Sequence, residues 1–224
     1  MIPPLIVERA LAAGLGLLAI TDHNASDNCG AMIQAAAGTG LAVLPGMEAQ
    51  TLEDVHVLCL FDTLEQAQAW QEVVFQHLPQ RSNPDEVLGP QFVVDAAGDL
   101  VRTETRLLLT GMDLSLNDVV RQVGALGGLA IPAHVDRPSF SLLANLGFVP
   151  PDLAVPALEI FWRSDPAALT ADHPDLAGWP LIRNSDAHRL SEMHACLQLE
   201  VAEPTVAELR LALARQQGRF YALI

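Results

Sequence analysis

Apolar runs alternate with amphipathic stretches along nearly the whole chain. The runs are apolar at consecutive positions rather than at every second one, which favours strands buried on both faces. The stretches between them carry apolar residues at helical spacing. This alternation is typical of an α/β fold built on a parallel sheet, either open or closed. The predicted strands lie at 17–21, 41–49, 54–61, 129–136, 157–161, 180–188 and 196–201.

Several predicted helices begin at recognisable capping residues. Thr63 and Thr205 each begin a capping-box pattern, and Ser115 is the predicted N-cap of another helix. The stretch 91–109 predicts two strands of a hairpin-like excursion. No repeat, low-complexity tract or linker divides the chain, so we expect a single domain over residues 1–224.

Composition narrows the range of partners. The chain has 224 residues, half of them hydrophobic, with a formal net charge of −15 and a pI of about 4.6. A polyphosphate gains nothing from such a surface, so bulk charge argues against a nucleic-acid partner. A small phosphorylated substrate stays compatible with it, because a few arginines can converge locally. No apolar run approaches the length of a membrane span, so no membrane partner is expected, and a homo-oligomer stays open.

Cysteine usage and the N-terminus indicate the compartment. Cys29, Cys59 and Cys196 lie far apart in the sequence, which indicates neither a disulfide framework nor a thiolate zinc site. The first residues lack the basic-then-apolar layout of a signal peptide. We therefore expect a cytoplasmic protein with reduced thiols.

Six ionisable side chains lie at or near the ends of predicted strands. In parallel α/β folds the carboxyl ends of strands converge on one face, where ligands bind. Neutral imidazole and carboxylate together suit zinc, manganese or iron, and one carboxylate can bridge two ions about 3.5–4 Å apart. The sequence therefore predicts a divalent metal centre. Its candidate ligands are His23, Glu48, His56, His134, Asp186 and His188.

Each candidate also has a purely structural interpretation. His56 could be a hydrogen-bonded core histidine, Glu48 could cap a turn, and Asp186 could cap a helix. Asp22 is interpreted as a turn or supporting residue rather than a ligand. The gathering of so many ionisable residues at strand ends favours the metal centre. A Ser-His-Asp hydrolase is not supported, because no Gly-x-Ser-x-Gly turn is present, and no Gly-rich phosphate loop precedes a helix.

Four stretches resemble successive motifs of the PHP (polymerase and histidinol phosphatase) superfamily. They are "AITDHN", "PGMEAQTLEDVHVLCLF", "IPAHVDRPSF" and "RNSDAH". The resemblance runs from about Pro3 to the C-terminus. It implies an α/β fold of the distorted (βα)7 TIM-like barrel type with two or three divalent metal ions, and hydrolysis of phosphate esters by metal-activated water.

The resemblance also implies a role for each candidate ligand. Glu48 matches a bridging glutamate, and His56 and His134 match two histidines that hold the second metal with it. His23 and His188 match ligands of a third metal. The second site would thus be complete in this chain.

Asp186 and Arg137 are the expected catalytic residues. Asp186 matches an aspartate at the first metal and could handle a proton, and Arg137 is similar to a basic residue that takes a substrate phosphate. The superfamily's usual first strand, which ends in His-x-His, is absent, so three usual ligands are missing and neighbouring strands are expected to have unpaired edges. A gene start further upstream is the favoured explanation. A real short form with fewer metals, or another residue or chain in the gap, are the others.

The leading hypothesis is therefore a metal-dependent phosphoesterase that hydrolyses a small phosphorylated substrate. The alternative is a catalytically impaired barrel that binds metal or a phosphorylated ligand as a regulatory module. Hydrolysis of an amide bond by the same kind of centre is a third, weaker hypothesis, because metal clusters are not committed to phosphorus.

Overall fold

The computed structural model describes residues 1–224 as a mixed α/β fold, which confirms the predicted class. None of its helices has both the length and the hydrophobicity that a membrane crossing requires. The helices are α1 (Pro3–Ala12), α2 (Cys29–Ala36), α3 (Leu64–His77), α4 (Asp85–Leu88), α5 (Leu116–Ala125), α6 (Leu142–Leu146), α7 (Pro166–Asp172) and α8 (Val206–Leu213), with 3-10 turns η1 (Pro174–Leu176) and η2 (Leu190–Glu192). The strands are β1 (Leu17–Ile20), β2 (Ala42–Gln50), β3 (His56–Leu60), β4 (Gln91–Val94), β5 (Leu100–Glu104), β6 (Leu129–Pro132), β7 (Leu158–Ile160), β8 (Leu181–Arg183), β9 (Leu197–Glu200) and β10 (Phe220–Leu223).

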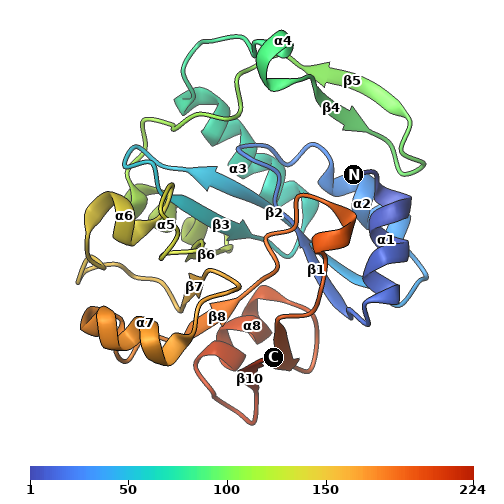
Figure 1. The fold of residues 1–224 in the computed structure, drawn as a ribbon. Helices are drawn as coiled ribbons and strands as arrows, with labels where there is room; N and C mark the ends of the chain where they lie inside the picture. The colour runs from blue at the N-terminus through green and yellow to red at the C-terminus, as the bar shows by residue number, and fades with distance from the viewer.

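The central sheet has the order β1-β2-β3-β6 and runs through the middle of the molecule (Figure 1). β1 is parallel to β2, whereas the β2–β3 and β3–β6 pairs are antiparallel. The prediction of a parallel sheet is therefore wrong for β3. Only residues 51–55 connect β2 to β3, and a parallel return needs a crossover of a dozen residues or more. The short connection leaves an antiparallel pair as the arrangement the chain can reach.

The other strands form separate pairs. β7 and β8 are parallel, β9 and β10 are antiparallel, and β4 and β5 form the predicted hairpin. These pieces do not join into a closed ring, so the predicted (βα)7 barrel is not observed. β1 is paired along one edge only. β10 was not predicted, because four residues after a helix are too few to show a strand pattern.

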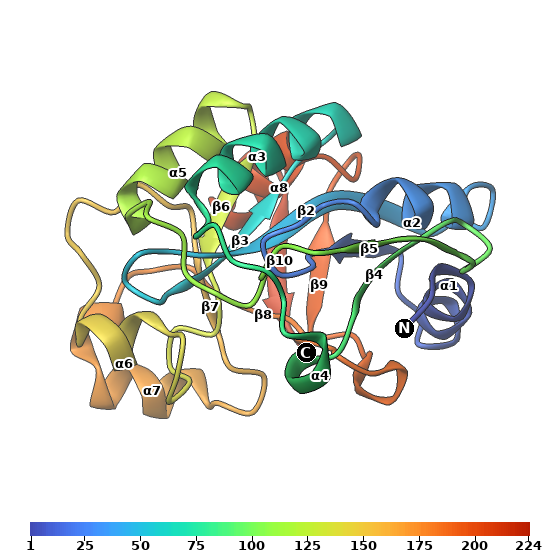
Figure 2. The ribbon, with the colours of Figure 1, turned by 90° about the horizontal axis from the view of Figure 1, so that it is seen from above.

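Helices α3 and α5 pack against one face of the central sheet (Figures 1 and 2). Trp70 and Val74 of α3 and Val119 and Val123 of α5 are fully buried, together with Cys59 of β3. Burial of each large apolar side chain stabilises the fold by about 1.5–3 kcal/mol. This interface therefore anchors the strands that carry the polar cluster described below.

The predicted helix starts are confirmed by their caps. Thr63 and Gln66 form both halves of a capping box at α3. The Ser115 hydroxyl accepts the N–H of Asp118 at α5, and Thr205 caps α8 in the same way. Each cap is worth about 1 kcal/mol.

Candidate metal centre

Glu48 lies at the centre of a polar cluster, inside β2 rather than after it. The last residue of β2, Gln50, pairs with His56, the first residue of β3. Because the two strands are antiparallel, the beginning of β3 and the end of β2 lie at the same end of the sheet. His23, just beyond β1, forms a parallel bridge with Glu48, and His134 follows the end of β6.

Three imidazoles surround the Glu48 carboxylate. Nδ1 of His56 lies 3.1 Å from Oε1, and Nε2 of His134 lies 3.2 Å from the same oxygen. Nδ1 of His23 lies 3.4 Å from Oε2. Glu48, His56 and His134 are buried, and His23 is half-buried. The structure thus brings together four of the six side chains that the sequence selected.

The charges of the cluster are coupled. Burial alone would raise the pKa of Glu48, but hydrogen bonds from His134 and His56 hold that pKa well below its ordinary value. For His134, burial lowers the pKa, yet the hydrogen bond to Glu48 outweighs it and the pKa is raised. For His23, burial wins and the pKa is lowered. Glu48 is therefore an ionised acceptor at any physiological pH.

Asp186, Arg137 and His188 lie beside this group rather than within it. Nη1 of Arg137 lies 2.8 Å from Oδ2 of Asp186, and Nδ1 of His188 lies 3.6 Å from Oδ1. The His188 ring is 5.9 Å from the ring of His23, and the His188 side chain is 60% exposed. The sequence assigned Arg137 to a substrate phosphate, whereas here its charge is balanced by Asp186.

The donor set fits a divalent metal ion. Ligand atoms of His23, Glu48 and His56 lie within 4.8 Å of one another, and imidazole with carboxylate suits zinc, manganese or iron. Nδ1 of the buried His134 has no hydrogen-bond partner, which is costly for a histidine that serves only the core. The grouping differs in one respect from that implied by the resemblance, because His23 lies against Glu48 as well as near His188.

Asn24 fixes the loop that carries His23, and sequence reasoning did not select it. Its side chain donates to the carbonyls of Leu108 (2.7 Å) and Thr110 (2.8 Å) and accepts the N–H of Gln50 (3.0 Å). Asn24 is fully buried with φ at +50°, a left-handed conformation that asparagine tolerates. The signal available in the sequence was its place directly after His23.

Glu159 in β7 is a second residue that sequence reasoning missed. Its carboxylate accepts the backbone N–H of His134 at 3.1 Å, and only 3% of the residue is exposed. Burial raises the pKa of Glu159 to about 7, although His134 and Asn184 act to lower it. An acidic residue inside an apolar strand was the signal that could have identified it.

Glu159→Gln should change how stability depends on pH. In the metal-free protein the folded state holds the Glu159 proton more tightly than the unfolded state does, so ionisation costs free energy of unfolding as the pH rises from about 4.5 to about 7. Glutamine removes this cost. Urea unfolding in EDTA should show the variant gaining on the parent by up to about 3 kcal/mol between pH 4.5 and pH 8.

The matched control is Glu72→Gln, on the exposed face of α3, whose difference from the parent should not vary with pH. A pH-independent difference for Glu159→Gln as well would contradict the assignment of a raised pKa to this carboxyl.

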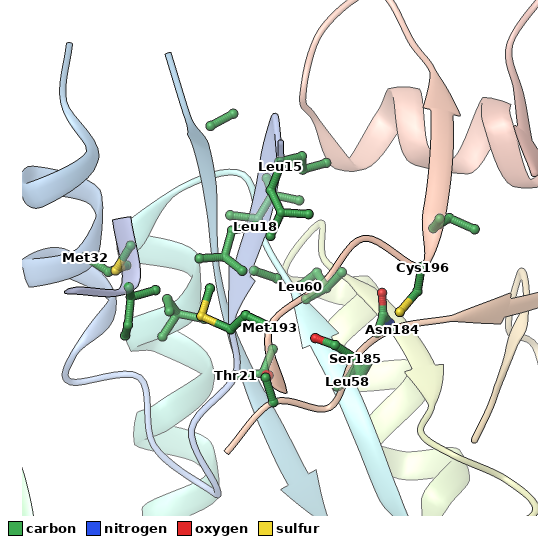
Figure 3. Close-up of a pocket in the computed structure, with 18 of the residues that line it drawn as sticks. Leu15, Leu18, Thr21, Met32, Leu58, Leu60, Asn184, Ser185, Met193 and Cys196 are labelled. Atoms are coloured by element: carbon green, nitrogen blue, oxygen red, sulfur yellow. The ribbon is translucent and has the colours of Figure 1, made fainter. Parts of the chain in front are cut away.

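A groove of about 1170 Å³ opens along the unpaired edge of β1 (Figure 3). Leu15 and Leu18 lie on one side and Cys196 on the other, and Leu60 lines its floor. All four residues of β1 are only half-buried, although the apolar run predicts burial on both faces. The groove also reaches His23 and Asp186. The sequence-based expectation of an unpaired edge is therefore met at β1.

The remaining basic candidates have other contacts. The guanidinium of Arg163 lies 4.2 Å from the ring centroid of Trp162, and Arg183 donates to the carbonyl of Ser164. His77, expected to be a solvent-exposed residue, pairs with Asp113 at 2.6 Å on the surface. None of them contacts the Glu48 carboxylate.

Comparison with known proteins places the fold. No protein-family model matches the chain, and no curated protein sequence matches it. The lesion-specific endonuclease Q from Pyrococcus furiosus is similar in structure, with a TM-score of 0.67 and 21% identity over 99% of this chain and 53% of that chain. Endonuclease Q in complex with a 27-mer duplex with an abasic lesion at the active site gives 0.66 and 21%, over 98% and 53%. A proposed metal-dependent phosphoesterase from Bifidobacterium adolescentis gives 0.54 and 20%, over 96% and 91%.

The DNA complex corrects one expectation. Bulk charge argued against nucleic acid, yet one of these similar structures holds a DNA duplex. Net charge is a property of the whole surface, whereas a phosphate contact needs only a few local groups. The chain spans about half the length of the endonuclease Q structures. The resemblance found in the sequence is confirmed at the level of the fold: this chain has the α/β fold that endonuclease Q and a proposed metal-dependent phosphoesterase share.

Proposed function

We propose that this chain is a metal-dependent phosphoester hydrolase. The observation that carries the proposal is the convergence of three imidazoles on the single buried carboxylate of Glu48. Similarity of fold to an endonuclease and to a proposed phosphoesterase supports the same chemistry. A purely structural cluster has no reason to leave His134 with an unpaired buried nitrogen.

Glu48, His56 and His134 would hold one ion, with His23 on the second carboxylate oxygen of Glu48. A bound divalent ion supplies Lewis acidity that activates water and balances phosphoryl charge. Hydrogen bonding to its imidazoles keeps Glu48 ionised and ready to bind a cation. The imidazoles of His56 and His134 enter the site from opposite sides of that carboxylate's Oε1 contacts, each fixed by its strand.

Arg137 and Asp186 would act as a pair. A phosphate monoester or diester offers two oxygens to the guanidinium of Arg137, which can bind them through its planar fork. When Arg137 turns to the phosphate, Oδ2 of Asp186 loses its partner and can accept a proton from the attacking water. The ion pair thus keeps both groups in place before substrate binds.

The substrate class is proposed to include strands of nucleic acid as well as the small phosphorylated molecules that the sequence suggested. A phosphodiester and a phosphomonoester present the same charged oxygens to Arg137 and to a metal. The complex of endonuclease Q with duplex DNA supports the inclusion of DNA.

Metal titration with a substrate panel tests the function. EDTA-treated protein should regain hydrolysis of p-nitrophenyl phosphate, bis-p-nitrophenyl phosphate or a labelled abasic duplex when Mn²⁺ or Zn²⁺ is added. Isothermal titration should show one ion or more bound per chain. Metal binding without turnover on any of these esters would contradict the proposed hydrolysis, and absence of metal binding would contradict the centre itself.

We also propose that a further strand at the open edge of β1 completes the site. The edge is unpaired, the groove beside it is largely apolar, and one end reaches His23 and Asp186. An extended segment pairs with such an edge through main-chain hydrogen bonds. A metal ligand at the end of that segment would lie at the cluster.

A further inference from the structure

Phe140 is an aromatic residue placed against the metal cluster with much of its surface open. Its ring lies nearly parallel to the ring of His56, with an interplanar angle of 6° and centroids 4.9 Å apart. The residue is 43% exposed, whereas Phe61 of the same chain is fully buried. Because His56 covers one face of the ring, the exposed surface lies on the other face and the edges.

The backbone holds this ring in place against its own preference. Phe140 has φ at +53°, which is strained for a bulky residue and costs about 1–3 kcal/mol. The chain is fixed on both sides: the Phe140 carbonyl accepts the N–H of His56 at 3.1 Å. The next residue, Ser141, is fully buried, its hydroxyl donates to the carbonyl of Arg137, and it caps α6. Strain retained by surrounding contacts is typical of a functional position.

A second aromatic group and a cation lie on the neighbouring loop. The N–H of Phe161 donates to Asp136 at 2.7 Å, which ties the end of β7 to the loop between His134 and Phe140. Trp162 follows, half-buried, with Arg163 stacked on its ring. The loops beside the cluster therefore offer flat surfaces and guanidinium groups, which suit a base with its phosphate.

We propose that the open face of Phe140 stacks a nucleobase next to the phosphate that the centre binds, so that the preferred substrate is a nucleotide or a nucleic-acid strand with an unpaired base. This inference rests on the proposed hydrolase function. Stacking of a base on an aromatic ring needs no particular base, because every base has a π face. Phe140 thus selects base-bearing esters from esters without a ring.

The experiment compares substrates that differ only in the base. Thymidine 5′-monophosphate is paired with 2-deoxyribose 5-phosphate, and a thymidine dinucleotide with its abasic counterpart. With metal-loaded protein, Phe140→Leu should raise KM about tenfold for the member that carries the base, with kcat changed less than twofold. For the baseless member neither constant should change. Phe140→Tyr keeps the ring and should behave like the parent on both.

Binding without turnover gives an independent measurement. Thymidine titrated into metal-loaded protein should perturb the parent and Phe140→Tyr but bind Phe140→Leu about tenfold more weakly. Equal losses by Phe140→Leu on both members of a pair would overturn the proposal, since that result assigns Phe140 only to holding His56. Hydrolysis of none of the esters by the parent would instead overturn the proposed function, and base binding would then still be read from the thymidine titration.

Discussion

Glu48→Gln should abolish the metal centre while leaving the fold intact. Glu48 is the one group that contacts three imidazoles, through both of its oxygens. Glutamine has the same shape but carries no charge and replaces one acceptor oxygen with a donor. We expect metal affinity to fall more than about 100-fold and kcat/KM for a phosphate ester to fall about 1000-fold. Isothermal titration and steady-state kinetics measure the two effects.

The fold should survive this change. Glu48 is 5% exposed, and keeping a charge buried is expensive, so removal of the charge offsets the lost hydrogen bonds. Circular dichroism and thermal unfolding in EDTA should match the parent within a few degrees. The control is Glu72→Gln on the surface of α3, which should change neither metal binding nor activity. Full activity in Glu48→Gln would contradict the proposed centre, whatever the substrate.

Supplying a strand to the open edge of β1 should raise both stability and hydrolysis. Met1, Ile2 and Pro3 line the same groove as β1, so an extended apolar segment joined before Met1 can reach that edge. The four half-buried residues of β1 would become fully buried, adding about 3 kcal/mol to the free energy of unfolding. The melting temperature should then rise by roughly 10 °C.

The end of the added segment separates pairing from metal binding. A segment that ends in His-x-His, as the resemblance implies, should also raise the number of bound ions and the turnover of p-nitrophenyl phosphate. The same segment ending in Ala-x-Ala should keep the gain in melting temperature and lose the gain in turnover. A version with proline at alternate positions cannot pair and should lose both. Equal melting temperatures for the pairing and proline versions would contradict strand addition.

The composition and order of the polar residues were sufficient to select the cluster. His23, Glu48, His56 and His134 each stand where an apolar run begins, turns or ends, and strand ends meet wherever strands pack into one sheet. Local signals also sufficed for the starts of α3 and α5, because a cap depends on residues three positions apart. These properties depend on neighbours in the chain, which a sequence displays directly.

Other features depend on contacts between distant residues, and no local pattern displays them. The sequence suggested a parallel barrel, whereas the five-residue connection before His56 makes β3 antiparallel and brings the beginning of that strand to Glu48. The pairing of Arg137 with Asp186 joins positions 49 residues apart. Glu159 and Phe140 looked like ordinary strand and loop residues until packing placed them against His134 and His56.

The sequence by itself determined the α/β class, the strand-end cluster and its suitability for a divalent metal, because residue type and spacing decide them. Only the tertiary structure decided the direction of β3, the open edge of β1 and the contacts that set each side chain's charge. Those depend on which surfaces meet and how deeply each group is buried, and burial changes the pKa of a group such as Glu159 without any change in its neighbours along the chain.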